Sequence, residues 1–219
     1  MTKIYFALAA ILVIAEIFES QTLLYIFKPM LIPALMLVYF LASSEKNFLY
    51  FVSLFCALIS NIFFLSTTRD FLLYGMIAFM IYRILTIIIV LKLISKQSLL
   101  PFIIACLPFV FIFSCLINLT MNSLSTSLYP AILNGILISI LCGIALSNYV
   151  MDDNRSNSWL AISTLLSVVL VYLFMIQKYY FPNNVFQPIS ALVFSAAHYA
   201  FYKFVIEAEK QPINRLNNN

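Results

Sequence analysis

Eight long apolar runs, separated by short polar breaks, decide what this chain can fold into. They cover residues 4–18, 23–41, 48–65, 71–93, 99–119, 127–146, 159–176 and 188–205. An α-helix needs about 20 apolar residues to cross the hydrocarbon core of a bilayer, and these runs are close to that length. No water-soluble fold can bury them, because 64% of the residues are apolar and only 9% are charged. Too few polar residues remain to cover a water-facing surface, so the chain is predicted to be an integral, multi-pass membrane protein.

The runs are expected to be helices and not the strands of a barrel. The chain has only three glycines, and polar and apolar residues do not alternate strictly along it, whereas the lumen-facing positions of a barrel are polar. Helices satisfy their own backbone groups in lipid. The sequence therefore predicts an all-α, polytopic membrane bundle of about eight transmembrane helices. We expect a single helical domain over residues 1–209 and a polar, disordered tail over residues 210–219.

The distribution of lysine and arginine predicts the orientation in the membrane. Eight spans place both termini on the same side. That side collects Lys3, Lys46, Lys92, Lys96, Arg155, Lys203, Lys210 and Arg215, and the other side only Arg69 and Lys178, with Lys28 near a helix end. Cytoplasmic loops carry the excess of basic residues. Both termini are therefore expected in the cytoplasm, and the membrane is the cell (inner) membrane if the source is bacterial.

Several classes of ligand are not expected. The four cysteines all lie in apolar runs and have neither the spacing of metal ligands nor that of a disulfide framework, so we expect no metal and no cofactor. The net charge of +4 is spread thinly over loops and tails, which argues against a nucleic-acid partner. The expected partners are membrane lipids, while the oligomeric state cannot be deduced from the sequence.

Among the ionisable residues inside the apolar runs four positions stand out, namely Glu16, Lys28, Arg83 and His198. A charge at the centre of a bilayer costs at least about 2.5–3.5 kcal/mol, so such residues usually face the interior of a bundle and have a partner. We interpret these four, together with Asn61, as candidate substrate-binding residues. No nucleophile elbow, glycine-rich phosphate loop or metal-ligand cluster accompanies them.

Each candidate has two interpretations. Lys28 or Arg83 could hold an anionic group such as a phosphate in a pocket between helices. Alternatively, Glu16 pairs with Lys28 or Arg83 as a structural link, and Lys28 reaches to the membrane surface. His198 could titrate near neutral pH, or it could make a hydrogen bond between helices.

Short motifs along nearly the whole chain carry a family resemblance. The strongest is Ala15-Glu16 followed by the segment LYIFKPMLIP at residues 24–33, in which a Lys-Pro pair precedes apolar residues and a second proline. Other motifs are Leu58-Ile59-Ser60-Asn61-Ile62, the four-residue steps Gly75, Phe79 and Arg83, then Gln177-Lys178-Tyr179 and Ala197-His198. In these features the chain resembles the YhhN family, whose members include lysoplasmalogenases that cleave the vinyl ether bond of lysoplasmalogens.

The resemblance implies a catalytic pair that this chain lacks. Members that hydrolyse vinyl ethers resemble general acid–base enzymes with two membrane-embedded aspartates, one as the acid and one as the base. Those positions correspond to Asn61 and Val171 in this sequence. Neither an amide nor an isopropyl group can transfer the proton that vinyl ether cleavage needs. The catalytic positions are therefore expected to be degenerate, with Glu16 the remaining carboxylate near the pocket.

Three functions remain open on the sequence alone. The resemblance implies a hydrolase of the lysoplasmalogenase type that acts on an ether lysophospholipid, with weak or no activity because both positions are replaced. The second is a non-catalytic lipid-binding or structural membrane protein that keeps the fold and the cationic pocket. A small transporter is the third, because intramembrane charges are also found in transporters.

Overall fold

The described part of the chain forms eight α-helices in this computed structural model. It describes the backbone of residues 2–66, 68–94, 98–181 and 183–217, with side chains except at residues 125 and 211–217. The helices are α1 (Thr2–Ile17), α2 (Gln21–Ala42), α3 (Phe48–Phe63), α4 (Arg69–Leu93), α5 (Leu99–Leu124), α6 (Leu128–Met151), α7 (Arg155–Met175) and α8 (Gln187–Asn217). Three short helical segments join them, η1 (Ser125–Ser127), η2 (Ile176–Tyr180) and η3 (Asn184–Phe186). The described residues form no strand.

The predicted all-α membrane bundle is confirmed, and each of the eight apolar runs is a helix. Six helices are long and apolar enough to cross a membrane. The other two, α1 and α3, have 16 residues each. At 1.5 Å per residue they are about 24 Å long, less than the roughly 30 Å of the hydrocarbon core.

α8 extends further than the sequence predicts. Its backbone is helical to Asn217, whereas a disordered tail was expected from residue 210. Extending an existing helix is much easier than starting one, because each added residue gains a hydrogen bond without a new nucleation step. The ion pair between Lys210 and Glu207, one turn apart at 3.5 Å, adds a small local stabilisation.

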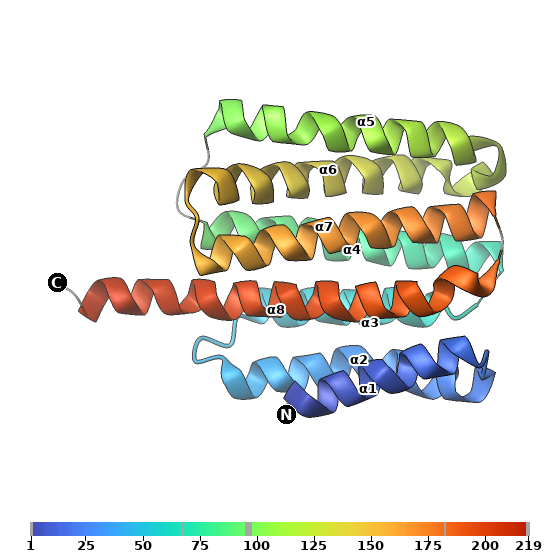
Figure 1. Cartoon of the computed structure of the whole chain (residues 1–219), viewed down its shortest axis with the longest axis horizontal. Coiled ribbons are helices and arrows are strands. Elements are labelled where there is room, and N and C mark those ends of the chain that lie inside the picture. The colour runs from blue at the N-terminus through green and yellow to red at the C-terminus, as the bar shows by residue number, and fades with distance from the viewer. Residues whose placement is uncertain (1, 67, 95–97, 182, 218–219) are drawn as a thin grey trace.

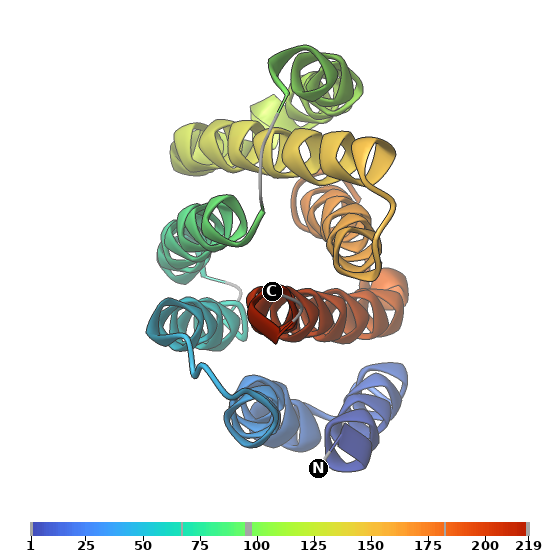
Figure 2. The ribbon, with the colours of Figure 1, turned by 90° about the vertical axis from the view of Figure 1, so that its left-hand side faces the viewer.

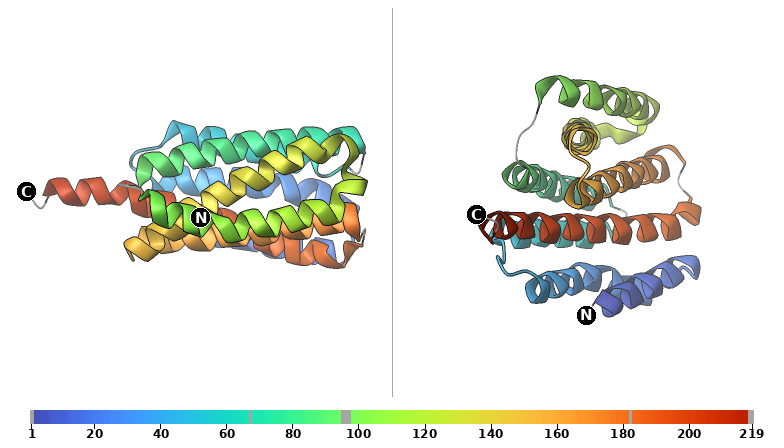
Figure 3. Two further views of the ribbon diagram at one scale, coloured as in Figure 1. Left: turned by 90° about the horizontal axis from the view of Figure 1, so that it is seen from above. Right: turned by 60° about the vertical axis from the view of Figure 1, so that its left-hand side comes forward.

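The helices are stacked in layers (Figure 1; Figure 2). α5 packs on α6 at one edge, followed by a layer of α4 and α7, a layer of α3 and α8, and a layer of α1 and α2 at the other edge. Figure 3 shows that the axes of the helices are roughly aligned and that α8 projects past the others at its C-terminal end. Both termini lie toward the same end of the bundle, called here the terminal end, as an even number of spans requires.

A buried carboxylate ties α8 to the connection between α2 and α3 at the terminal end. Glu209 is only 5% exposed and accepts hydrogen bonds from Tyr39 Oη at 2.5 Å and from Ser43 Oγ at 2.7 Å. The same two hydroxyl oxygens accept hydrogen bonds from the main-chain amides of Asn47 and Lys46. Glu209 therefore organises the loop that joins two spans.

Glu209→Ala should destabilise the protein because it leaves the Tyr39 and Ser43 hydroxyls without their acceptor. Each lost partner costs about 1–3 kcal/mol when the remaining group is buried. The measurement is the midpoint of thermal unfolding in detergent. Glu207→Ala is the matched control on the same helix, because its pair with Lys210 is partly exposed and should contribute little. Equal midpoints for the two variants would contradict this role of Glu209.

Reporter fusions test the orientation, which stays a prediction from the basic residues. Green fluorescent protein should fluoresce when fused after Leu216 and not when fused after Ser66, at the opposite end of the bundle. Alkaline phosphatase should show the reverse pattern. Lys96, which counts toward the predicted bias, lies outside the described residues. Phosphatase activity from the Leu216 fusion alone would contradict a cytoplasmic C-terminus.

Candidate functional site

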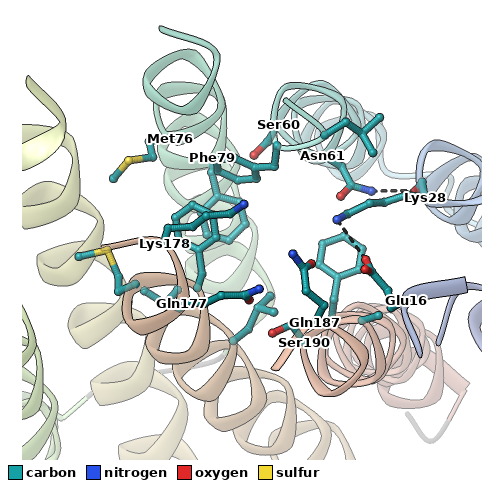
Figure 4. Close-up of a pocket in the computed structure, with 18 of the residues that line it drawn as sticks. Glu16, Lys28, Ser60, Asn61, Met76, Phe79, Gln177, Lys178, Gln187 and Ser190 are labelled. Atoms are coloured by element: carbon teal, nitrogen blue, oxygen red, sulfur yellow. Dashed lines mark hydrogen bonds and ion pairs between the residues drawn. The ribbon is translucent and has the colours of Figure 1, made fainter. Parts of the chain in front are cut away.

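A cavity of about 310 Å³ opens between the helices in the half of the bundle away from the chain termini. All eight helices contribute side chains to its wall. Figure 4 shows polar groups gathered at one part of the cavity, with aromatic and aliphatic side chains around the rest. The polar lining consists of Glu16, Glu19, Gln21, Lys28, Ser60, Asn61, Asn134, Gln177, Lys178, Asn184, Gln187 and Ser190.

An ion pair between α1 and α2 forms one side of this polar part. Lys28 Nζ donates to Glu16 Oε1 at 3.4 Å, and the side chain of Glu16 is 5% exposed while that of Lys28 is 22% exposed. Of the two structural partners considered for Glu16, the structure selects Lys28 and not Arg83. Since both charges also line the cavity, the pair leaves them close to any ligand that enters.

Asn61 holds α3 against α2 at the same point. Its Nδ2 donates to the main-chain carbonyl of Lys28 at 2.8 Å (Figure 4). Lys28 precedes Pro29, and Pro33 follows one turn later, so this part of α2 contains residues that cannot donate backbone hydrogen bonds. The amide of Asn61 therefore does a structural task that an ionised aspartate, which has no proton to donate, cannot perform.

A π-helical turn at the end of α7 supplies two polar residues that the sequence analysis did not select. Five residues, Ile176–Tyr180, adopt this wider helix, which is rare and frequently found at functional sites. Gln177 is buried and Lys178 is half-buried, and both line the cavity. Lys178 approaches the cavity from the opposite side to Lys28 in Figure 4. The only signal in the sequence was the Gln-Lys pair of the family motif.

The remaining wall of the cavity is apolar. It includes Val171, the second position at which the resemblance implies an aspartate, so Asn61 and Val171 do lie on one cavity. Other apolar lining residues are Leu12, Leu24, Ala57, Phe64, Met76, Phe79, Phe113, Leu116, Leu170, Phe174 and Phe194. The cavity therefore combines charged and polar groups in one part with an apolar wall around the rest.

Arg83 and His198 are buried but do not line the cavity. Arg83 is 1% exposed, and its guanidinium carbon lies 4.8 Å from the centroid of the Phe79 ring. His198 is 4% exposed, donates from Nδ1 to the carbonyl of Phe194 at 3.0 Å, and packs against the Phe194 ring. Phe79 and Phe194 do line the cavity, so each aromatic ring covers one of the two predicted residues. Of the five candidate residues, three therefore lie together on the cavity, namely Glu16, Lys28 and Asn61.

The polar groups of the cavity are better suited to binding a ligand than to transferring protons. Its polar groups are lysines, amides, hydroxyls and two carboxylates, Glu16 and Glu19. Ser190 Oγ and Asn134 Oδ1 are buried there without a hydrogen-bond partner in the described part of the chain. They are therefore free to contact a ligand or water. Within the described residues, histidine, cysteine, aspartate and glutamate side chains form no group of three that could hold a metal ion.

Comparison with known proteins identifies one family. The model described as the YhhN family matches residues 23–205, which is most of the chain. The matched range includes Lys28, Asn61, Arg83, Val171 and His198. Neither a curated protein nor a solved structure gave a match.

Lys28→Met should destabilise the protein because it leaves Glu16 buried without its counter-charge. Removing one member of a buried ion pair costs roughly 3–5 kcal/mol, and the partial exposure of Lys28 reduces this to about 1–3 kcal/mol. The double variant Glu16→Gln/Lys28→Met should recover most of the loss, as measured by thermal unfolding in detergent. If the double variant is less stable than Lys28→Met, the pair is not the source of the effect.

Proposed function

We propose that this chain, which belongs to the YhhN family, binds an ether lysophospholipid in its cavity and hydrolyses it slowly or not at all. The observation that carries the proposal is the two-part lining of the cavity. Lys28 and Lys178 stand at the polar part, and the remaining wall is built from aliphatic and aromatic side chains. Six helices that are long and apolar enough to cross a membrane support a ligand drawn from the bilayer.

The two lysines support binding of a phosphate group. Lys28 forms an ion pair with Glu16, whereas Lys178 has no ion pair among the described residues. Lys178 is therefore the better donor for the phosphate of a ligand, and Glu16 with Glu19 suits the ammonium group of a zwitterionic headgroup. A volume of about 310 Å³ lies at the lower end of the range for ligand sites, roughly 300–1,000 Å³. It suits a headgroup with the first carbons of one chain.

The polar set of the cavity argues against efficient hydrolysis. Cleavage of a vinyl ether requires protonation of a carbon atom and attack by water, and each general acid or base contributes about 10²–10⁴-fold. Asn61 and Val171, which replace the implied aspartates, cannot take part. Glu16 already acts as the counter-ion of Lys28, and an ionised carboxylate has no proton to give.

The second candidate function is hydrolysis that depends on Glu16. It is favoured by one observation, the position of this carboxylate on the same cavity as Asn61 and Val171. In that case Glu16 would release Lys28 when the substrate binds and take up a proton from solvent. It would deliver this proton to the vinyl carbon and recover one from the attacking water. This hypothesis differs from the first in requiring aldehyde release.

Native mass spectrometry of the purified full-length protein tests the binding. A lysoplasmalogen should bind, and Lys178→Gln should weaken binding about 10- to 100-fold, because a hydrogen bond to a charged group is worth about 1.5–3 kcal/mol. The matched control is Lys203→Gln, which removes a lysine of α8 that does not line the cavity. Equal affinities for the two variants would contradict binding at Lys178.

The same preparation tests the chemistry. Incubation with a lysoplasmalogen should release aldehyde at a rate close to the uncatalysed background. Robust release that is abolished by Glu16→Gln would overturn the first proposal and support the second. A folded protein that neither binds nor cleaves the lipid would contradict both.

A further inference from the structure

Arg83 presents an unused hydrogen-bonding edge in the middle of the bundle. It lies near the midpoint of the 25-residue helix α4 and is 1% exposed. Its Nε and Nη2 atoms are buried and have no hydrogen-bond partner among the described residues. These two nitrogens form the side of the guanidinium group that binds two oxygens of a carboxylate or phosphate at once. Leaving such a group unmatched inside a membrane protein is costly.

No acidic side chain of the described residues is available to Arg83. The chain has eight acidic residues, all within the described part. Two are buried and are bound elsewhere, Glu16 to Lys28 and Glu209 to Tyr39 and Ser43. The other six are exposed or half-buried, with five at helix ends or in loops and one, Glu207, within α8; the five are Glu19, Glu45, Asp70, Asp152 and Asp153. The acceptor that this edge lacks is therefore not one of the acidic side chains of the described residues.

Aromatic rings separate this edge from the cavity. Phe79, which stacks on the guanidinium group, also lines the cavity, where Figure 4 labels it. Phe79 packs on Tyr82 at 5.4 Å between ring centroids, Tyr82 on His198 at 5.5 Å, and His198 on Phe194 at 4.2 Å. Nε2 of His198 is a further buried atom that has no hydrogen-bond partner among the described residues. Rotation of the Phe79 side chain would connect Arg83 with the cavity.

We propose that Arg83 binds an oxyanion, a carboxylate or phosphate, through its Nε and Nη2 atoms, at a site separate from the headgroup site at Lys28 and Lys178. The oxyanion supplies both the two acceptor oxygens and the negative charge that the surroundings of Arg83 lack. It enters through the cavity when the Phe79 ring moves aside. The oxyanion comes from one of two sources, a small inorganic anion or the carboxylate of a membrane-soluble acid.

Thermal unfolding of the full-length protein in dodecyl maltoside, an uncharged detergent, tests this site. The probes are sodium phosphate, compared with sodium chloride at equal ionic strength, and sodium decanoate, compared with decanol. Phosphate or decanoate should raise the unfolding midpoint, whereas chloride and decanol, their respective controls, should not. Protection by phosphate identifies an inorganic source, and protection by decanoate alone identifies a membrane-soluble acid. Absence of protection by both probes overturns the proposal and leaves water as the occupant.

Arg83→Lys is the matched variant, because lysine keeps the positive charge and loses the two-nitrogen edge. It should weaken the protection about tenfold or more in probe concentration, while Lys203→Gln, which removes a lysine that does not line the cavity, should leave it unchanged. Equal protection of Arg83→Lys and the unmodified protein overturns the proposal, as does an equal loss of protection in Lys203→Gln. Failure of the lysoplasmalogen experiment leaves these outcomes unaffected.

Phe79→Ala keeps the test decisive if Arg83→Lys does not fold. It retains the guanidinium group and removes the ring between it and the cavity. The protection should then develop faster after mixing than in the unmodified protein. An unchanged half-time shows that the probe does not pass Phe79, and overturns the proposal.

Discussion

Hydrogen bonds from polar side chains to main-chain carbonyls of neighbouring helices fix how the helices of this bundle pack. Lipid tails are as apolar as the helix surfaces, so burial of apolar area gives little drive for helices to associate in a bilayer. Tyr5 of α1 donates to the carbonyl of Ser195, and Ser60 of α3 donates to that of Gly75. Ser163 of α7 donates to a carbonyl of α8 in the same way. Each bond joins two helices at one depth and so determines their register.

The sequence predicted the helices well and the inside of the bundle only in part. Apolar run length is a direct consequence of bilayer thickness, so all eight runs appeared as helices, although α8 continues well past its run to Asn217. The rotation of each helix about its own axis could not be predicted in the same way. A soluble helix reveals its buried face through its polar face, but a membrane helix is apolar on every side. The positions of Gln177 and Lys178 on the cavity also depend on a π-helical turn, which no residue pattern in the sequence predicts.

The buried ionisable residues separated into two groups for a physical reason. Glu16 and Lys28 lie on adjacent helices near the end of the bundle away from the termini, where an ion pair is partly hydrated. Arg83 and His198 lie deeper, where aromatic rings cover them and no carboxylate approaches. From spacing alone, all four residues were candidates for one pocket. Only packing could show that Phe79 and Phe194 stand between them.

The shortness of α1 has a consequence for the membrane around the protein. This helix is about 24 Å long and stands at the outer edge of the bundle beside α2, carrying Glu16 near its C-terminal end. Hydrophobic mismatch of several ångströms is relieved when the bilayer thins against the protein. Lipid headgroups next to α1 would then sit deeper than elsewhere, nearer to the level of Glu16 and Lys28. A lipid leaving the bilayer on this side would have a shorter distance to travel before its phosphate met a lysine.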